Sequence, residues 1–230
     1  MKTIITSIGC CSLKRSNRRT LAISVLPIGT VEVVAPMKAT LLEIQKKIEK
    51  RTAWINRQRR YFATLHAERP ERRYCNEATH RYLGRQYRLK VTKTDKPNVK
   101  LRGAYLHIDS RSTSSKAVSA LLSGWMREKA KEQFDRRLEK WSSWCLKRNL
   151  PEPKLHLLEM LKRWGSTRAN GHIFLNPELV RTPSQCVDYV IVHEVCHIKH
   201  PRHDKAFFTE LEKLCPKWRV LKQRLETSEL

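Results

Sequence analysis

Two histidines four residues apart constrain this chain more than any other feature of its sequence. They lie in the run His193-Glu194-Val195-Cys196-His197, with a glutamate directly after the first histidine. Residues four apart stand one turn apart on the same face of an α-helix, so both imidazoles can reach one metal ion. Glu194 would lie beside that ion, where a carboxylate can take a proton from water. The spacing therefore predicts a metal centre built on a helix.

The flanking residues predict the helix itself. Thr182 suits the N-cap, Pro183 suits the first helical position, and Gln185 would complete a capping box with Thr182. Pro201 would end the helix, because the residue before a proline disfavours the α region. Both histidines lie off one apolar stripe with three- and four-residue spacing, which predicts burial on one side and metal ligands on another. The stripe comprises Val187, Ile191, Val195 and Ile198.

A catalytic zinc site takes three protein ligands and keeps one position open. Two candidates for the third ligand follow the motif. His200 would stand about 10 Å along the helix axis from His193, which is far for one shared ion. His203 lies beyond the turn at Pro201 and opens a second helix predicted over 204–214, so it can approach from another side. The spacing favours His203 over His200.

These residues resemble the YgjP-like metallopeptidase family, which is related to the SprT-like zinc proteases. The resemblance covers nearly the whole chain, with two departures. Thr167 stands where the family often has cysteine, and Phe208 stands where it often has tryptophan; neither is a ligand position. The matching segments are 189–197, 200–201 and 203–208, then 163–166 and 171–176, and further back 82–89 and 53–55.

The resemblance implies a zinc ion held by His193, His197 and His203, with Glu194 as the catalytic acid/base. It also implies that the strand expected at 172–175 lies beside the zinc helix, where an edge strand could pair with an extended peptide.

The resembling segments contain further candidates for the site. Tyr189 lies one turn before His193, where it could stabilise an oxyanion or simply pack in the core. His172 is a lone histidine, for which a structural role is favoured over a ligand role. The candidates for substrate binding are Tyr189, Trp164, Ser166 and Phe174.

Composition places the chain among cytoplasmic proteins of ordinary hydrophobicity. Hydrophobic residues make up 40% of its 230 residues, and no apolar run approaches the length of about 20 residues that spans a membrane. Its amino terminus lacks the apolar segment of a signal peptide. The seven cysteines are an odd number without a C-x-x-C pair, which disfavours a cysteine–zinc site and suits a reducing cytosol. Cys186 and Cys196 are expected to be small core residues.

The net charge of +25 bears on partners. Such a surface attracts polyanions, so it favours either binding to nucleic acid and phosphate-bearing substrates or a generic affinity for acidic molecules. The cations are spread through the chain rather than gathered in one tail. Composition alone leaves both interpretations open.

Patterning predicts an α+β protein, with a β-rich amino-terminal region over 1–112 and a zincin-like, mainly helical catalytic half over 113–230 that includes a small sheet. The amino-terminal region would contain one helix at 40–60, capped by Thr40 and Glu43. A serine-rich segment at 109–116 marks the boundary. Other predicted elements are strands at 4–8, 21–25, 31–34, 82–91 and 99–108, a loop at 61–80, a long helix at 116–147, and strands at 155–164 and 172–175 around an Asn170-Gly171 turn.

Three function classes remain. The favoured one is a zinc metallopeptidase acting on a peptide or protein. The second is a zinc- or magnesium-dependent pyrophosphatase of nucleoside triphosphates, although no P-loop or carboxylate cluster supports it. The third is a basic nucleic-acid-associated protein with a structural zinc site. Glu194 argues against this last class, because a structural site would fill its fourth position with protein and no fourth ligand is evident.

Overall fold

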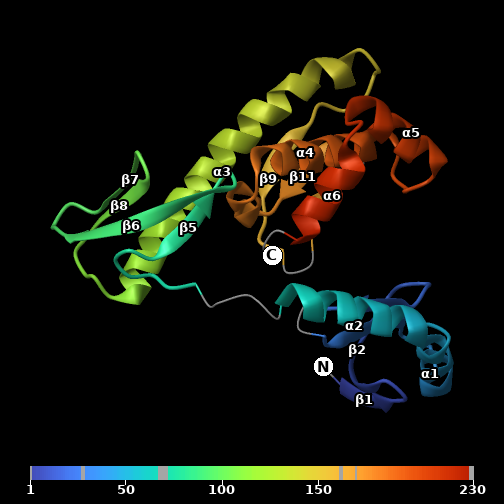
Figure 1. Cartoon of the computed structure of the whole chain (residues 1–230). Helices are drawn as coiled ribbons and strands as arrows, with labels where there is room; N and C mark the ends of the chain where they lie inside the picture. Colours follow the sequence, from blue (N-terminus) through green and yellow to red (C-terminus); the bar gives the residue numbers. More distant parts are fainter. Residues whose placement is uncertain (1, 27–28, 67–71, 161–162, 169, 228–230) are drawn as a thin grey trace. The chain divides into compact units, whose positions relative to one another are not determined.

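A computed structural model describes residues 2–26, 29–66, 72–160, 163–168 and 170–227 of the chain. The described residues form six α-helices, one short 3₁₀ helix and three β-sheets, which confirms the α+β prediction (Figure 1). The chain divides into two compact units, Met1–Glu71 and Arg72–Leu230. None of the helices within the described ranges is long and apolar enough to cross a membrane.

The division between the units does not fall in the serine-rich segment at 109–116. That segment joins β8 (Tyr105–Ser110) to α3 (Ser115–Leu146), and both elements pack together within the second unit. Its serines begin the long helix, because the Ser114 side chain accepts a hydrogen bond from the backbone N–H of Ala117. A polar, serine-rich run here is a helix start and not a boundary between units.

The first unit contains a four-stranded sheet in the order β1-β2-β4-β3. β2 and β4 run parallel, and the two outer pairs are antiparallel. The strand predicted at 4–8 is present as β1, which begins two residues earlier and lies at one edge of the sheet. Alternate residues of β2 and β4 are buried and face a separate apolar core, as in a half-buried strand. The strands are β1 (Lys2–Thr6), β2 (Gly9–Ser16), β3 (Ala22–Val25) and β4 (Val31–Pro36).

Two helices, α1 (Leu41–Glu49) and α2 (Thr52–His66), replace the single helix predicted at 40–60. The capping box of Thr40 and Glu43 is confirmed. The chain tightens after α1, where the backbone N–H of Arg51 bonds to the carbonyl of Ile48 three residues back. This turn lets buried isoleucines on both helices reach the same core. α2 also extends through the first part of the loop predicted at 61–80, whose residues 67–71 lie outside the described ranges.

The second unit begins with another four-stranded sheet, in the order β5-β6-β8-β7. Each strand-like run predicted from the sequence is split by a tight turn. Leu83-Gly84 separates β5 from β6, and Gly103-Ala104 separates β7 from β8. Gly84 and Gly103 have φ angles of 80° and 55°, which glycine adopts without the strain a side chain would add. The remaining strands are β5 (Thr79–Tyr82), β6 (Arg85–Lys93) and β7 (Asn98–Arg102).

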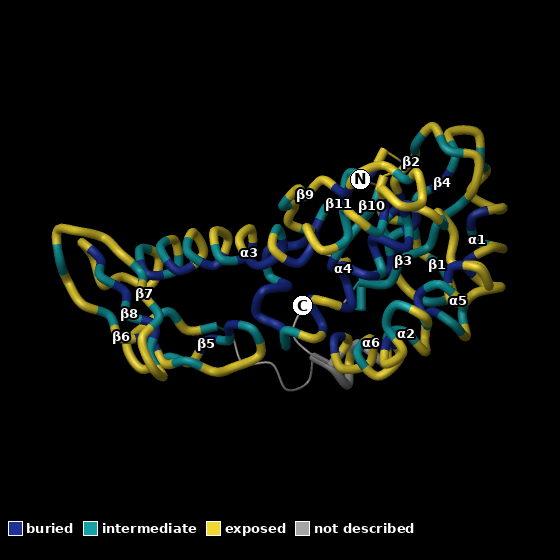
Figure 2. The backbone as a smooth tube through the Cα atoms, turned by 90° about the horizontal axis from the view of Figure 1, so that it is seen from above, coloured by how far each residue is buried: buried dark blue, intermediate teal, exposed yellow. Residues whose placement is uncertain are grey.

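The long helix predicted at 116–147 is confirmed as α3, with nearly the same bounds. Its buried residues recur at helical spacing and face the inner side of the β5–β8 sheet at one end, and a 3₁₀ helix (Pro177–Arg181) and α4 (Ser184–Lys199) at the other (Figures 1 and 2). One continuous apolar core therefore joins that sheet to the rest of the second unit. The stripe on α3 includes Val118, Leu122, Met126, Ala130, Phe134, Leu138 and Cys145.

A three-stranded sheet completes the second unit, in the order β10-β11-β9. The strand predicted at 155–164 ends early, as β9 (Lys154–Leu157). β11 (His172–Leu175) pairs with a neighbour on both sides, so the edge strands are β10 (Gly165–Thr167) and β9, and β10 packs against α4 (Ser184–Lys199). The strand at 172–175 is therefore a central strand, and the edge strand beside the metal-site helix is β10. The elements that follow are a 3₁₀ helix (Pro177–Arg181), α4 (Ser184–Lys199), α5 (Lys205–Leu214) and α6 (Trp218–Thr227).

Candidate metal centre

The helix that carries the histidine motif, α4, begins differently from the prediction. Pro183 is its N-cap, and no side chain makes a capping hydrogen bond. Thr182 ends the preceding 3₁₀ helix instead, because its hydroxyl donates to the carbonyl of Leu179. The first turn is held from outside by the buried Arg137 of α3, which donates to Ser184 Oγ at 2.8 Å. The predicted capping box of Thr182 and Gln185 is therefore wrong, although the helix is present.

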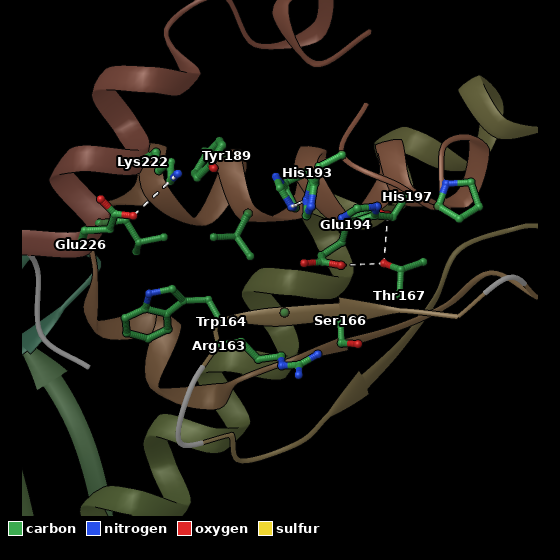
Figure 3. A pocket seen from close by; sticks show the side chains of 15 residues that line it. Arg163, Trp164, Ser166, Thr167, Tyr189, His193, Glu194, His197, Lys222 and Glu226 are labelled. Carbon is green, nitrogen blue, oxygen red and sulfur yellow. Dashed lines mark hydrogen bonds and ion pairs between the residues drawn. The ribbon is translucent and has the colours of Figure 1, made fainter. Parts of the chain in front are cut away.

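Three histidines meet at one point in the structure. His193 and His197 project from α4 (Figure 3), and His203 lies in the turn before α5. One ligand nitrogen from each of the three lies within 4.8 Å of the others, and His203 Nε2 is 3.0 Å from His193 Nε2. His200 is the C-cap of α4, and its ring lies 4.0 Å from the Glu210 carboxylate. The geometry thus groups His203, and not His200, with the motif.

The position of His203 follows from the local sequence. α4 ends at Lys199, directly before the turn that contains Pro201. α5 starts at Lys205 with Asp204 as its N-cap, whose carboxylate accepts the backbone N–H of Phe207 at 3.0 Å. Phe207 is fully buried beside the histidine rings. The turn at Pro201 and the capped start of α5 therefore place His203 beside the two histidines of α4.

The charge state of the three rings suits metal binding. Burial lowers the pKa of His193 to about 3, with further lowering from His197 and His203. Burial likewise lowers the pKa of His197 and of His203. His197 donates its Nδ1–H to the carbonyl of His200 at 3.0 Å, which leaves Nε2 with a lone pair. Three neutral imidazoles on one point are a donor set that fits zinc.

The neighbouring cysteine is not part of this donor set. Cys196 is fully buried, and burial raises the pKa of its thiol to about 12. Cys186, on the same helix, is also fully buried, which confirms the prediction that both are core residues. Burial also raises the pKa of the Cys186 thiol, so neither thiol would ionise at neutral pH, and the candidate metal donors in the described cluster are the three histidines.

Glu194 lies against the edge strand β10. Its carboxylate Oε2 is 2.7 Å from the Thr167 hydroxyl, which is also 2.9 Å from the Glu194 backbone carbonyl and can donate to either oxygen (Figure 3). Only 5% of Glu194 is exposed. Burial raises its pKa to about 7, against the opposing effects of the Thr167 hydrogen bond and the positive charge of Arg163. A carboxyl in this range can both accept and release a proton near neutral pH.

The Glu194 carboxylate fits against β10 because residue 165 is a glycine without a side chain. A Cβ on Gly165 would stand 2.6 Å from Glu194 Oε1 and 2.8 Å from its Cδ, closer than unbonded atoms approach. Thr167, two residues further along β10, supplies the hydrogen bond. The sequence did not predict either role. In the sequence Thr167 is only a departure from the family pattern, because nothing local places β10 against α4.

A pocket with a volume of about 560 Å³ opens beside the histidines. Tyr189, Trp164 and Ser166 line it, as expected of substrate-binding candidates (Figure 3). Burial raises the pKa of Tyr189, so its hydroxyl keeps its proton. Phe174 does not line the pocket: it stacks on His156, and the Arg168 guanidinium lies 4.7 Å from its ring centroid. The structure therefore brings three of the four candidates together.

The pocket also has walls that the sequence did not predict. Arg163 contributes a cation from the segment before β10. Lys222, Leu225 and Glu226 contribute from α6, where Lys222 Nζ lies 3.9 Å from the Glu226 carboxylate (Figure 3). Spacing of Trp218, Leu221 and Leu225 could have predicted α6, but not its place over the metal centre.

His172 lies outside this centre. Its Nδ1 is 2.6 Å from His156 Nε2 on the neighbouring strand β9, and the two rings stack with centroids 4.8 Å apart. The metal cluster of the described residues does not include it. This arrangement agrees with the structural role expected for His172.

The comparisons with known proteins identify the family of the chain. The chain matches the model of the YgjP-like metallopeptidase domain over residues 19–228. Among solved structures it is similar to the metallopeptidase zymogen of Pyrococcus abyssi abylysin, with 19% identity, a TM-score of 0.33, and coverage of 46% of this chain and 92% of that chain. No curated protein matches the chain significantly. The family match spans nearly all of the sequence, motif included, and the chain therefore belongs to the YgjP-like metallopeptidase family.

Proposed function

We propose that the chain is a zinc-dependent peptidase in which His193, His197 and His203 hold the metal and Glu194 is the general base. One observation carries this proposal. Three histidine nitrogens lie within 4.8 Å of one another, and the residue directly after His193 is a buried carboxylate at the wall of the same pocket. A structural zinc site would not need the carboxylate or the pocket.

A zinc ion at the three histidines would supply Lewis acidity, polarising a carbonyl and lowering the pKa of water. The remaining steps belong to the protein. Glu194 accepts the proton of the attacking water and returns it to the leaving amine. Thr167 and Gly165 fix the carboxylate during both transfers, through a hydrogen bond and a close backbone contact.

A peptide fits the pocket better than a nucleoside triphosphate does. The edge strand β10 forms one wall, so an extended peptide can add to it as a further strand through backbone hydrogen bonds. Trp164, Val190 and Leu225 offer apolar contacts to side chains. A triphosphate with magnesium would instead require clustered carboxylates, and the described lining residues include only Glu194 and Glu226.

The test replaces Glu194 with glutamine in zinc-loaded protein. Glu194→Gln keeps the shape of the side chain but cannot accept a proton, so we expect full zinc content, an unchanged melting temperature and a loss of turnover of about 10²–10⁴-fold. Glu139→Gln, on the exposed face of α3, is the matched control and should keep wild-type turnover.

Turnover is measured against a mixed peptide library and against nucleoside triphosphates. Wild-type turnover by folded, zinc-loaded Glu194→Gln protein would exclude Glu194 as the base. Hydrolysis of triphosphates with no peptide cleavage would replace the peptidase proposal by the pyrophosphatase alternative.

A further inference from the structure

The outer face of the β5–β8 sheet is a second feature of the molecule, separate from the metal centre. Successive residues of a strand point to opposite faces, and α3 covers the inner face (Figure 1). Leu89, Leu106 and Ile108 are fully buried on that inner face. Their neighbours along each strand therefore point outward, and Figure 2 shows exposed and half-buried backbone positions along these strands.

The outward residues are strongly basic. The register aligns them in rows: Arg88 opposite Tyr105, and Lys90 opposite His107 on one side of the central strand β8. Arg102 and Lys100 flank the same two residues from β7 on the other side. Among all outward residues of the sheet there are five cations and one acid, Asp109. The outward residues are Thr79, Arg81, Gln86, Arg88, Lys90, Thr92, Asn98, Lys100, Arg102, Tyr105, His107 and Asp109.

Two aromatic rings occupy the middle of this basic face. Tyr105 and His107 are two residues apart on β8, and their ring centroids are 6.3 Å apart. The Arg88 guanidinium lies 5.4 Å from the Tyr105 ring centroid. Both aromatic residues are only half-buried, although they lie on a central strand. The cations of the outer face therefore surround two partly exposed aromatic rings.

The first unit supplies an internal comparison. Its sheet has the same strand order and the same parallel central pair. Its outward residues, however, include one cation, Lys14, and one acid, Glu32, and no aromatic ring. The basic aromatic face is therefore not a by-product of the topology or of the high net charge. Its outward residues are Thr3, Ile5, Cys10, Ser12, Lys14, Ser16, Ala22, Ser24, Glu32, Val34 and Pro36.

We propose that the outer face of the β5–β8 sheet binds a single strand of nucleic acid. The cations contact phosphates, and bases stack on Tyr105 and His107. Charge complementarity selects a polyanion. The rings select one with accessible bases, because aromatic residues at the centre of a four-stranded sheet stack unpaired bases, whereas a duplex keeps its bases inside.

The test measures binding of the full chain to fluorescein-labelled oligouridylate and oligothymidylate of about 12 nucleotides, by fluorescence anisotropy. A duplex of the same length and polyglutamate serve as competitors. Single strands should bind more tightly than the duplex, and polyglutamate should compete poorly. Absence of binding to both oligonucleotides at about 50 mM salt overturns the proposal, as does equal competition by polyglutamate.

Two sets of variants separate stacking from charge. Tyr105→Leu with His107→Leu should weaken binding roughly tenfold and leave its salt dependence unchanged, while Tyr105→Phe should bind like the wild type. Lys90→Ala, Lys100→Ala and Arg102→Ala together should also weaken binding, and should reduce the slope of log affinity against log salt by about 2.

The matched control removes the same number of charges elsewhere. Lys38→Ala, Lys46→Ala and Lys50→Ala are exposed positions of the first unit and should change the affinity less than about twofold. An equal loss of affinity in this control and in the charge variant of the sheet would show diffuse attraction and overturn the proposal. Unchanged binding by the folded Leu variant, checked by its melting temperature, would also overturn it.

Discussion

The two four-stranded sheets share a strand order but differ in what lies beneath them. The first sheet packs with α1 and α2 around a core of its own, which contains Leu13 and Val33. The second sheet contributes Leu89 and Leu106 to a core that continues into α4, the helix of the metal centre. The same strand order thus forms a sheet with a core of its own in the first unit, and in the second unit a sheet whose core also packs against the helix of the metal centre. The metal centre should depend on the second sheet and not on the first.

The largest expected effect comes from metal removal. Ligand binding stabilises only the state that binds, by about 4 kcal/mol when the free ligand is at 1,000 times its dissociation constant. Chelation of zinc should therefore destabilise the second unit by roughly this amount and leave the first unit unchanged. Hydrogen exchange followed by mass spectrometry, read on peptides from α1 and from α4, measures each unit separately.

Variants of the two candidate third ligands test which histidine binds the zinc whose removal destabilises the second unit. His203→Ala should bind little zinc and should resemble the chelated wild type, whereas His200→Ala should keep zinc and respond to the chelator. Retention of zinc by His203→Ala together with its loss from His200→Ala would show that the wrong histidine was assigned. Equal destabilisation of both units by the chelator would remove the comparison itself.

The sequence predicted the helices of the site better than its strands. Four-residue spacing identified α4, and the turn at Pro201 followed by Asp204 identified α5, because both signals are local. The preference for His203 over His200 likewise needed only helix geometry. Failures occurred where pairing joins distant segments. Nothing near residues 165–167 in the sequence shows that they form an edge strand against Glu194, and Thr167 by itself is only a departure from the family pattern.

Turns account for most of the remaining errors. Turns at Gly84 and Gly103 divide the two long strands predicted from the sequence into four strands. Thr182 caps the end of the preceding 3₁₀ helix instead of the start of α4. A side chain that can cap two adjacent elements does not reveal in sequence which one it serves. Composition left a nucleic-acid partner and a generic affinity for acidic molecules both open, and only strand register could gather five cations on one face.

Matched leucines in the two sheets test the difference between their cores. Leu13 pairs with Val33 between β2 and β4, and Leu89 pairs with Leu106 between β6 and β8. Either leucine changed to alanine should destabilise its own unit by about 3 kcal/mol, because a cavity remains. Only Leu89→Ala should also weaken zinc retention, since its core continues into α4. Urea titration followed by hydrogen exchange and zinc release measures both effects. Zinc release from Leu13→Ala as fast as from Leu89→Ala would contradict independent cores.

Gly165→Ala should lower the turnover of the enzyme and leave the stability of the first unit unchanged. The new Cβ would displace the Glu194 carboxylate, and a misplacement near 1 Å can lower turnover on the order of 10²-fold. Zinc content should stay at the wild-type level, because the atoms nearest to the new Cβ belong to Glu194 and not to a histidine. Gly124→Ala is the control, as a Cβ there meets nothing within 4 Å. Wild-type turnover by Gly165→Ala would show that the position of the Glu194 carboxylate set by Gly165 is not needed for turnover.

The smallest expected effect is a pH dependence confined to the second unit. Burial acts to raise the pKa of Glu178, but the guanidinium groups of Arg181 and Arg72 more than offset it and hold the pKa below the ordinary value of 4.5. A carboxylate with a lowered pKa stabilises the folded state above the pKa it has when unfolded. Its contribution is lost as the pH falls through the lower, folded value.

Glu178→Gln should therefore destabilise the second unit at pH 7 and match the wild type increasingly well below about pH 4.5. The side chain is 39% exposed, which screens the ion pairs, so we expect a difference of roughly 1 kcal/mol. Glu139→Gln, exposed on α3, should show no such difference at any pH. Unfolding by urea at a series of pH values, followed in each unit by hydrogen exchange, measures the gap. If the gap between wild type and Glu178→Gln stays constant down to acidic pH, or if it opens in the first unit, then the ion pairs of Glu178 are not its source, and the pH dependence does not distinguish the two units.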